Sequence, residues 1–444
     1  MFPITKHTSG AAVAIAAALV LTSCSGGGGE AEAGDQSMDL ASCGPSGDLS
    51  ILTWRTDLVE DGTFDGYVAA FKDKYPDIGE VDIQGITDYE GEVKTRMSTD
   101  DYGDVLAIPG SVTPDQLSQF FEPLGTQEDF AQAYRWINDK SYDSLNYGIP
   151  VVGNVMGLVY NKEVFAAAGI EEFPATPDEF LAAMAAVEAT DATIAPVYTN
   201  YKDGWPLTQW SSFVGTIGGP SATNDMTRDD APWQGEKDYG VIDALIYDLT
   251  EQGLIEDDPT TTNWEQSKQM LATGQIGVMA LGSWAIPQMQ DAAEAAGVER
   301  ESIGYMPFPY QADGAFHASA GGDYNLGINV NSANKCAAWA WIDWFNTESG
   351  YAESQVGLSP LADGAIPDAL ADFMAQVELV ELDAAPAGKE ALFADIDTES
   401  GIVTTSPDYR MAMIDDARSG ARTKQEIFDQ LNSDWATARA GVEG

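Results

Sequence analysis

Tryptophan is the residue type in this chain best suited to binding a ligand. The chain has 11 tryptophans, and their positions in the predicted elements suggest different roles. Trp339, Trp341 and Trp344 share one apolar, helix-like segment, so packing in a core is their expected role. Five others stand at a predicted strand end, helix start or loop, beside glycine, proline or a polar residue: Trp54, Trp205, Trp210, Trp233 and Trp284. α/β proteins hold ligands at such places. An indole face fits the apolar side of a sugar ring, although a place in a core is the alternative for each of the five taken singly.

Sequence motifs for catalysis are largely missing. The chain contains no His-Glu-x-x-His, no Gly-x-x-x-x-Gly-Lys-Ser/Thr and no Gly-x-Ser-x-Gly. His317 is the one histidine outside the N-terminal segment, and a lone histidine is typical of a structural residue. The acidic run at 395–399 lacks the glycine and the glutamate that a calcium loop needs. We therefore expect no catalytic residue, no metal and no cofactor.

The N-terminal segment has the pattern of an export signal. Lys6 is its one basic side chain apart from a histidine, and an uncharged run of small and apolar residues extends from 11 to 21, which is too short for a transmembrane helix. The ending at 21–24, Leu-Thr-Ser-Cys, resembles a bacterial lipobox, which implies cleavage before Cys24 and a lipid on that residue. An ordinary cleaved signal with a chance cysteine is the alternative.

The segment that follows has the composition of a flexible tether. Residues 25–37 are rich in glycine and acidic side chains and contain no aromatic or β-branched residue. Such a composition buries too little apolar surface to fold. We therefore expect a signal peptide at 1–23, a tether at 24–47 and a folded body from 48, held by the Cys24 lipid at the extracellular face of the cell membrane.

The charge balance excludes two classes of partner. The chain has 21 basic and 71 acidic residues, and its net charge is −50. Nucleic acids and anionic lipid surfaces both require a basic surface, so neither is an expected partner. The acidity itself identifies no ligand, because a solvated acidic surface also keeps a protein soluble.

Two cysteines remain beyond Cys24, namely Cys43 and Cys336. Outside the cell they could form a disulfide. One could equally be a loose thiol and the other a buried one, and the sequence leaves both arrangements open.

The first part of the body alternates strand-like and helix-like runs. Strands are predicted at 49–54, 81–83 and 104–108, with helices at 64–71 and 89–97 between them. This order indicates a parallel sheet with helices on its faces. The later part contains further helices and a strand at 275–281, and from 368 onward it is expected to be mainly helical.

Blocks spread along the chain carry a family resemblance. They are, in order, Phe71-x-x-x-Tyr75-Pro76, Tyr102-Gly103-Asp104-Val105, Gly148-Ile149-Pro150, Asn161-Lys162-Glu163, Thr176-Pro177-Asp178-Glu179 and Gly282-Ser283-Trp284. In this order, behind a lipobox, they resemble the solute-binding lipoproteins of bacterial ABC importers, the family that includes maltose-binding protein. The resemblance covers nearly all of the chain after Cys24.

The resemblance implies an α/β, two-lobed, periplasmic-binding-protein-like fold of type II, in which hinge-connected lobes hold a ligand cleft between them. Lobe 1 is expected to comprise 48–152 plus 321–347, and lobe 2 to comprise 153–320 plus 348–444. The chain then crosses between lobes near Val152, Gly321 and Thr347. Such lobes close around a ligand by hinge bending.

The resemblance also implies which residues face the cleft. Trp284, in the Gly-Ser-Trp block, is expected to be the main aromatic platform. The other candidates, taken from the resemblance or from the pattern of strand ends, are Asp203, Trp205, Trp54, Arg55, Asp57, Gly322, Asp323, Trp210, Trp233 and Ser111. The segment at Ser111 does not reproduce a polar motif that contacts maltose, so the sequence does not point to maltose itself.

The function implied by the resemblance is that of the substrate-binding component of an ABC importer. Such a protein captures a carbohydrate, here expected to be an oligosaccharide, and delivers it unaltered to the membrane permease subunits. A polyol phosphate, which favours a basic cleft, and a polyamine, which favours acidic and aromatic residues, are the alternative solutes. A secreted glycosidase is the alternative from another class, and it would need two carboxylates at a fixed separation.

Overall fold

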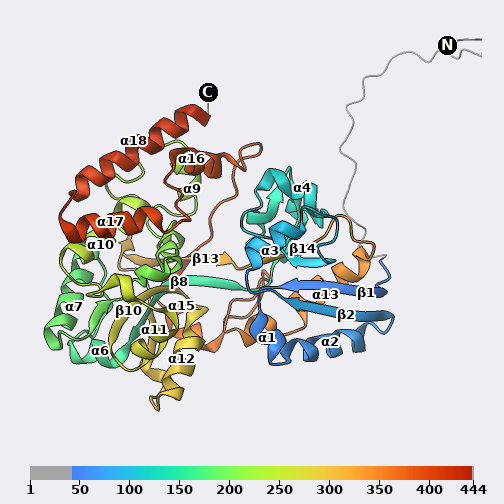
Figure 1. Ribbon diagram of the computed structural model, residues 1–444, viewed down its shortest axis with the longest axis horizontal. Helices are drawn as coiled ribbons and strands as arrows, with labels where there is room; N and C mark the ends of the chain where they lie inside the picture. The colour runs from blue at the N-terminus through green and yellow to red at the C-terminus, as the bar shows by residue number, and fades with distance from the viewer. Residues whose placement is uncertain (1–42, 443–444) are drawn as a thin grey trace, which may run out of the picture. The chain divides into compact units, whose positions relative to one another are not determined.

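The computed structural model describes residues 43–442, which belong to one compact unit. The predicted signal peptide, Cys24 and most of the predicted tether lie outside them. Two β-sheets, each flanked by helices, form two lobes (Figure 1). The α/β class expected from the sequence is confirmed. Within residues 43–442, no helix has both the length and the hydropathy that crossing a bilayer requires.

The first lobe is built on a five-stranded sheet with the order β2-β1-β3-β14-β7. Its strands are β1 (Gly47–Thr53), β2 (Ile78–Gly85), β3 (Val105–Ala107), β7 (Ile149–Pro150) and β14 (Asn325–Ile328). β1 runs parallel to β2 and β3, as the alternation of strands and helices predicts. β14 is antiparallel to β3 and β7, because it enters this sheet from the other lobe.

Seven α-helices and a small sheet complete the first lobe in the described part of the chain. The helices are α1 (Thr56–Glu60), α2 (Thr63–Lys74), α3 (Tyr89–Arg96), α4 (Leu117–Phe120), α5 (Gln127–Ala133), α13 (Lys335–Thr347) and α14 (Tyr351–Ser354). The small sheet has the order β4-β6-β5, with β4 (Gly125–Thr126), β5 (Ser141–Tyr142) and β6 (Leu145–Asn146). Trp341 of α13 is buried against Phe71 of α2, with ring centroids 5.1 Å apart, which confirms the expected core role.

The second lobe is built on a seven-stranded sheet. Its strands are β8 (Gly153–Asn161), β9 (Ala195–Val197), β10 (Ile276–Gly282), β11 (Ile303–Met306), β12 (Gln311–Ala312), β13 (Ala315–Gly322) and β15 (Val377–Val380). β15 lies in the segment expected to be mainly helical, and it pairs in parallel with β13. Its four residues, Val-Glu-Leu-Val, are too few to show a strand period in the sequence.

Helices cover the second sheet (Figure 1). They are α6 (Lys162–Ala167), α7 (Pro177–Thr190), α8 (Trp205–Thr208), α9 (Ala222–Met226), α10 (Asp238–Glu251), α11 (Trp264–Ala272), α12 (Ala285–Ala295), α15 (Ala371–Met374), α16 (Leu392–Ser400), α17 (Asp408–Ser419) and α18 (Lys424–Val442). α7 begins as its sequence predicts, because Thr176 Oγ1 accepts the Glu179 N–H at 3.2 Å and Pro177 occupies the first helical position.

The chain passes between the two sheets at three neighbouring places. Asp323 follows β13, and its N–H donates to Val152 O at 2.8 Å, so that the first two passages lie side by side. The third follows α14, where Leu358 exchanges two backbone hydrogen bonds with Gly153. Tyr351 is buried in the core of the first lobe, so this passage comes later than the expected position near Thr347. The apolar face of the short helix α14 keeps it on that core.

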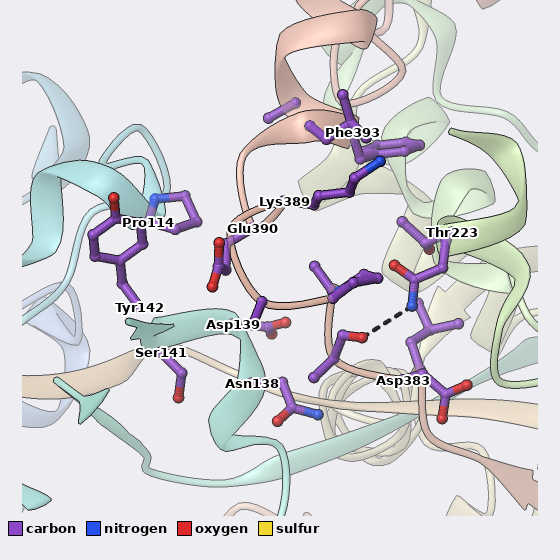
Figure 2. Close-up of a pocket in the computed structure, with 18 of the residues that line it drawn as sticks. Pro114, Asn138, Asp139, Ser141, Tyr142, Thr223, Asp383, Lys389, Glu390 and Phe393 are labelled. Atoms are coloured by element: carbon purple, nitrogen blue, oxygen red, sulfur yellow. Dashed lines mark hydrogen bonds between the residues drawn. The ribbon is translucent and has the colours of Figure 1, made fainter. Parts of the chain in front are cut away.

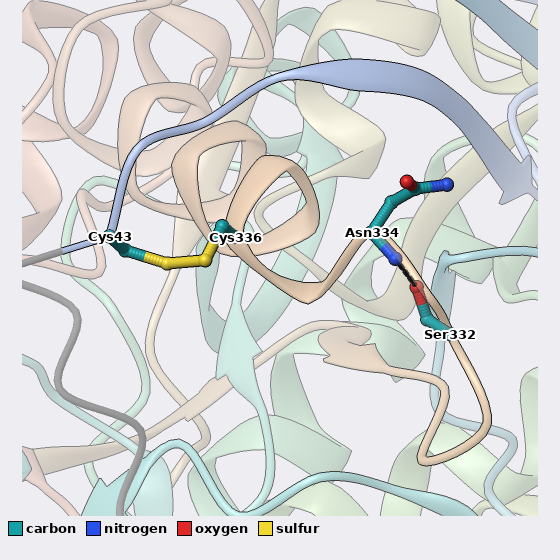
Figure 3. The surroundings of a disulfide bond; sticks show 4 residues. All are labelled: Cys43, Ser332, Asn334 and Cys336. Carbon is teal, nitrogen blue, oxygen red and sulfur yellow. Dashed lines mark hydrogen bonds between the residues drawn. A yellow bond between two sulfur atoms is a disulfide. The ribbon is translucent and has the colours of Figure 1, made fainter.

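Cys43 and Cys336 form a disulfide, the arrangement that the sequence left open. Their Cα atoms lie 5.5 Å apart, and the bond ties the residues before β1 to the first turn of α13 (Figure 3). It joins positions separated by 293 residues. The bond therefore fixes the start of the described chain to the first lobe.

Replacing both cysteines with serine is expected to lower the free energy of unfolding by about 5 kcal/mol, because the bond restricts a very long loop in the unfolded chain. Urea denaturation of the oxidised protein and of the double variant measures the difference. The wild-type protein treated with a thiol reductant is the control, and it should unfold together with the variant. Coincident transitions for the oxidised protein and the variant would show that the bond contributes no stability.

Candidate functional site

Two neighbouring cavities lie where the lobes meet. The Trp54 cavity has a volume of about 550 Å³, and the Trp136 cavity, lined by that residue, has a volume of about 400 Å³. Both take lining residues from both lobes, and both are lined by Asn154, Trp284 and Asp323. Volumes of this size are typical of sites for small molecules. These three shared residues therefore mark the centre of a candidate binding site.

Trp284 belongs to a cluster of three tryptophans in the second lobe, which we call the tryptophan trio. Its ring centroid lies 5.7 Å from that of Trp205 and 5.8 Å from that of Trp264, and the last two are 4.9 Å apart. Trp205 begins α8, Trp264 begins α11, and Trp284 immediately precedes α12. All three are partly exposed. Trp284 lines both cavities, so the trio supports the wall that this residue presents.

Trp264 was missed by the sequence reasoning, although the signal for it was available. It stands at a helix start beside Asn263, whose Oδ1 accepts the Gln266 N–H at 2.9 Å. This is the same kind of position that singled out Trp205 and Trp284.

The first lobe presents its own aromatic group. The ring of Trp54 lies 4.5 Å from that of Tyr324 and 6.3 Å from that of Tyr89. The Tyr89 hydroxyl donates to Ala107 O at 2.9 Å, which anchors the group to the end of β3. Trp54 lines the Trp54 cavity together with Trp284 from the other lobe. Aromatic side chains from both lobes therefore contribute to one cavity.

Arg55 is held by several acceptors at the Trp54 cavity. Its Nε and Nη2 donate to the two carboxylate oxygens of Asp57 at 2.9 and 2.7 Å, and Nη1 donates to Tyr351 Oη at 2.9 Å and to Gln355 Oε1 at 2.5 Å. The hydrogen bond from Arg55 lowers the pKa of Asp57. Burial raises the pKa of Tyr351 to about 12, so that hydroxyl stays neutral at physiological pH. The guanidinium is thus already neutralised by protein groups.

Five acidic residues line the two cavities, and in the described part of the chain three of the five form ion pairs with arginine, whereas Asp139 and Asp323 do not. The pairs are Asp57 with Arg55, Asp291 with Arg300 and Glu381 with Arg135. Asp323 instead accepts the Tyr324 N–H at 2.7 Å and the Asn154 Nδ2 at 3.4 Å. A site whose charges are mostly compensated suits a neutral, polar ligand better than a phosphate or a polyamine.

Trp136 was missed by the sequence reasoning because its role depends on a close approach of distant segments. It adopts a left-handed backbone conformation, with φ of 57°, and the Arg135 guanidinium lies 4.4 Å from its ring centroid. A Cβ atom at Gly153 would come within 2.0 Å of the indole, and one at Gly322 within 3.2 Å of Trp136 Cβ. Gly322 lines the Trp136 cavity, and it also allows this tight packing beside the crossings.

Two candidates from the sequence are core residues, and we correct their assignment. Trp210 is only 2% exposed and Trp233 only 1%, and neither lines one of the two cavities. The indole N–H of Trp233 donates to the buried Asp243 carboxylate at 2.7 Å. Trp210 packs against Phe213, with ring centroids 6.0 Å apart. Their flanking polar residues suggested a surface position, but the helices of the second lobe cover them.

Two further candidates lie on the surface outside these cavities. Ser111 is exposed after β3, and Asp203 is exposed in the short 3₁₀ turn Tyr201–Asp203 that leads to Trp205. Neither lines the Trp54 or the Trp136 cavity. The predicted residues that do line them are Trp54, Arg55, Asp57, Trp284, Gly322 and Asp323.

A third cavity of about 320 Å³ adjoins the Trp136 cavity, with which it shares Asn138, Asp139 and Leu382. Figure 2 shows Tyr142 of the first lobe on one side of it and Thr223 of the second lobe on the other. The segment between β15 and α16 supplies much of the remaining wall and is held by a hydrogen bond from Asn224 Nδ2 to Ala384 O at 3.0 Å. The space between the lobes thus extends beyond the two central cavities.

Comparisons with known proteins agree with this architecture. The model of the bacterial extracellular solute-binding protein family matches residues 55–352. Among curated proteins, the multiple sugar-binding protein of Streptococcus mutans is 23% identical over 300 residues, which cover 65% of this chain and 68% of that protein. The diacetylchitobiose-binding protein of Streptomyces coelicolor is 30% identical over 175 residues, covering 37% of this chain and 36% of that protein.

Solved structures are similar over nearly their whole length. A binding protein of an ABC transporter from Bifidobacterium animalis subsp. lactis, in complex with mannobiose, has a TM-score of 0.81 at 31% identity and covers 91% of this chain and 97% of its own. A manno-oligosaccharide-specific binding protein from the same organism, in complex with mannotriose, has a TM-score of 0.81 at 32% identity, with the same coverage. These similarities confirm the two-lobed fold. The chain belongs to the family of bacterial extracellular solute-binding proteins.

Proposed function

We propose that this protein is the carbohydrate-binding component of an ABC importer and that it captures a short manno-oligosaccharide between its lobes. The observation that carries the proposal is the position of Trp284, which lines both central cavities and has Trp54 of the other lobe on the wall of one of them. Indole faces stack on sugar rings, and the amide and carboxylate groups of Asn154 and Asp323 can bond the hydroxyl groups. The mannobiose and mannotriose bound in the two similar structures support this sugar class.

The compensated charges of the site distinguish this proposal from the alternatives. A polyol phosphate would need a free cation, and Arg55 is already bonded to Asp57. A polyamine would need several unpaired carboxylates, and three of the five acidic residues at the cavities have arginine partners, which leaves Asp139 and Asp323. A glycosidase would need a carboxylate pair with separate roles, and binding proteins of this family deliver their solutes unaltered. We therefore assign the protein no catalytic step.

The proposal includes the location and the partners of the protein. A lipid on Cys24 would hold it at the extracellular face of the membrane, where the permease subunits of the importer would receive the sugar. The core groupings favour a first lobe of about 48–152, 323–347 and the following turn through α14, with the remainder in the second lobe. Closure of these lobes would be driven by ligand contacts that form only in the shut state.

Isothermal titration calorimetry with mannobiose and mannotriose tests the proposed ligand, with maltotriose, diacetylchitobiose and spermidine as comparators. We expect micromolar or tighter binding of a manno-oligosaccharide and no cleaved sugar by chromatography after prolonged incubation. Binding of spermidine with no response to any sugar would overturn the proposal, and so would the appearance of cleaved sugar.

Asp323 should make the affinity dependent on pH. Burial raises the pKa of Asp323, against the opposing effects of its hydrogen bonds and of the Arg55 charge. Its ionised form accepts hydrogen bonds from sugar hydroxyl groups, so the affinity should fall as the pH is lowered through this raised pKa. A carboxyl group with a raised folded-state pKa favours folding more at low pH, so its protonation does not explain the loss by unfolding.

Calorimetry at pH values from about 4 to 8 measures this dependence, since an ordinary carboxyl group titrates near the lower end of that range. The Asp323→Asn variant is the matched control, and its weaker affinity should vary little across the range. An equally steep dependence in the variant would assign the effect to another group.

A further inference from the structure

Glu256 is a buried acid that the binding site itself does not use. Its side chain is only 4% exposed, although the chain carries 71 acidic residues and most of those in the described part are at the surface. Its carboxylate accepts the Thr199 N–H at 2.7 Å, the Thr199 hydroxyl at 2.6 Å and the Tyr201 N–H at 3.4 Å. The guanidinium of Arg418 bonds the main-chain oxygen of Glu256, at 3.4 Å. The carboxylate is thus held by neutral donors of one short segment.

That segment leads directly to the tryptophan trio. It leaves β9 at Val197, turns at Asn200 with φ of 53°, and reaches Gly204 with φ of 75° just before Trp205. The Gly204 N–H donates to Asn200 O at 3.2 Å and to Tyr201 O at 3.0 Å. Hydrogen bonds within the turn therefore hold its two ends together, and the carboxylate of Glu256 fixes the residues at its start.

The same segment is also bonded to the helix that carries Trp264. Asn200 Nδ2 donates to Ser267 Oγ at 3.3 Å, and Ser267 Oγ donates to Trp264 O at 2.7 Å. The Lys202 N–H donates to Thr262 Oγ1 at 2.9 Å, two residues before Trp264. The position of the turn thus sets the distance between Trp205 and Trp264, whose rings lie 4.9 Å apart and both contact Trp284.

We propose that Glu256 is a positioning residue that holds the tryptophan trio in the arrangement required for ligand binding. This inference rests on the proposed function of the site. A carboxylate is needed because the two backbone N–H groups that face it can only donate and the Thr199 hydroxyl donates to it as well, whereas an ionised carboxylate offers only acceptors. An amide at this position would place an NH₂ group against a donor and leave a buried N–H unsatisfied. Glu256 therefore acts on the ligand through Trp205 and Trp264, without lining either central cavity.

The Glu256→Gln variant of the full chain tests the proposal, because it keeps the shape of the side chain and changes only its charge and its hydrogen bonding. Near-ultraviolet circular dichroism in the absence of ligand reports the coupling between the neighbouring indoles of the trio. The spectrum of a Trp264→Phe variant shows how much of the wild-type signal comes from the trio. We expect the glutamine variant to lose at least about half of the near-ultraviolet signal that comes from the trio. We also expect it to bind mannotriose about 10-fold more weakly, as for a residue that supports a binding hot spot.

Asp104→Asn is the matched control. Asp104 also accepts one backbone N–H and one hydroxyl, from Ser50 at 2.9 Å and Ser332 at 2.5 Å, but it lies in the first lobe and lines neither central cavity. The control should keep the dichroism of the trio and an affinity within about twofold of the wild type, even if its melting temperature falls.

A second substitution keeps the test decisive if the glutamine variant does not fold. Thr199→Val removes the hydroxyl donor and should reproduce the change in dichroism, whereas Thr199→Ser, which keeps the donor, should restore the wild-type spectrum. Unchanged dichroism in a folded Glu256→Gln variant, or in Thr199→Val where the glutamine variant does not fold, would overturn the positioning role. A wild-type protein that binds no mannotriose would overturn the proposed function instead. It would not decide the role of Glu256, because that role is tested by spectra recorded without ligand.

Discussion

Replacing Trp284 with alanine is expected to lower the affinity for mannotriose by about 100-fold, or close to 3 kcal/mol, while the protein remains folded. This indole is the one tryptophan that lines both central cavities, and its removal would withdraw a stacking surface from two sugar positions at once. It would also leave Trp205 and Trp264 without the ring that packs against both. Trp284→Phe keeps an aromatic face and should lose only about 10-fold.

Trp339→Ala is the matched control for this prediction. Trp339 is also partly exposed, and its ring lies 5.9 Å from that of Phe130 in the first lobe, but it lines neither central cavity. The control deletes the same side chain and should leave the affinity within about twofold of the wild type. Calorimetry with mannotriose measures the affinities, and far-ultraviolet circular dichroism confirms folding. An equal loss of affinity in both variants would mean that the effect of Trp284→Ala is not local to the site.

The elements that the sequence predicted well are those with local signals. The first three strands and the helices between them follow apolar periodicity, and α7 follows its capping residues Thr176 and Pro177. β15 was missed because it has only four residues and depends for its structure on pairing with β13, whose partner residues lie 61 positions earlier in the chain. The late crossing after α14 was also missed, because only the packing of Tyr351 into the first lobe reveals it.

The candidate site was predictable only where a side chain stands beside a strand end or a helix start. Trp54 and Trp284 lie at such places, and both line a cavity. Trp233 has similar flanking residues, but its indole N–H meets a buried carboxylate from a helix later in the chain. Trp136 and Asn154 lie beside the three places where the chain passes between the lobes. These places are distant in sequence, so no local pattern marks the two residues.

The carboxylate that bonds Trp233 belongs to a buried ion pair in the second lobe. Asp243 and Arg410 both have completely buried side chains, and Arg410 Nε donates to Asp243 Oδ1 at 2.9 Å. The remaining hydrogen bonds of the pair involve Leu207 O, Ser211 Oγ, Tyr409 Oη and Trp233 Nε1. α10 and α17 are joined through this pair, and the guanidinium also lies over the ring of Tyr409, 4.7 Å from its centroid.

Arg410→Met is expected to lower the free energy of unfolding by about 3–5 kcal/mol, because it leaves the Asp243 carboxylate charged, buried and without its cation. The double variant Arg410→Met with Asp243→Leu removes both charges and should recover a large part of that loss, since the desolvation cost disappears together with the attraction. Urea denaturation of the wild type, both single variants and the double variant gives the coupling energy. Exposed Arg228, which pairs with Asp225 on the surface, provides the control substitution Arg228→Met, expected to cost less than about 1 kcal/mol. A similar small effect of Arg410→Met would mean that water reaches Asp243 in the variant and that the core of the second lobe tolerates the charge.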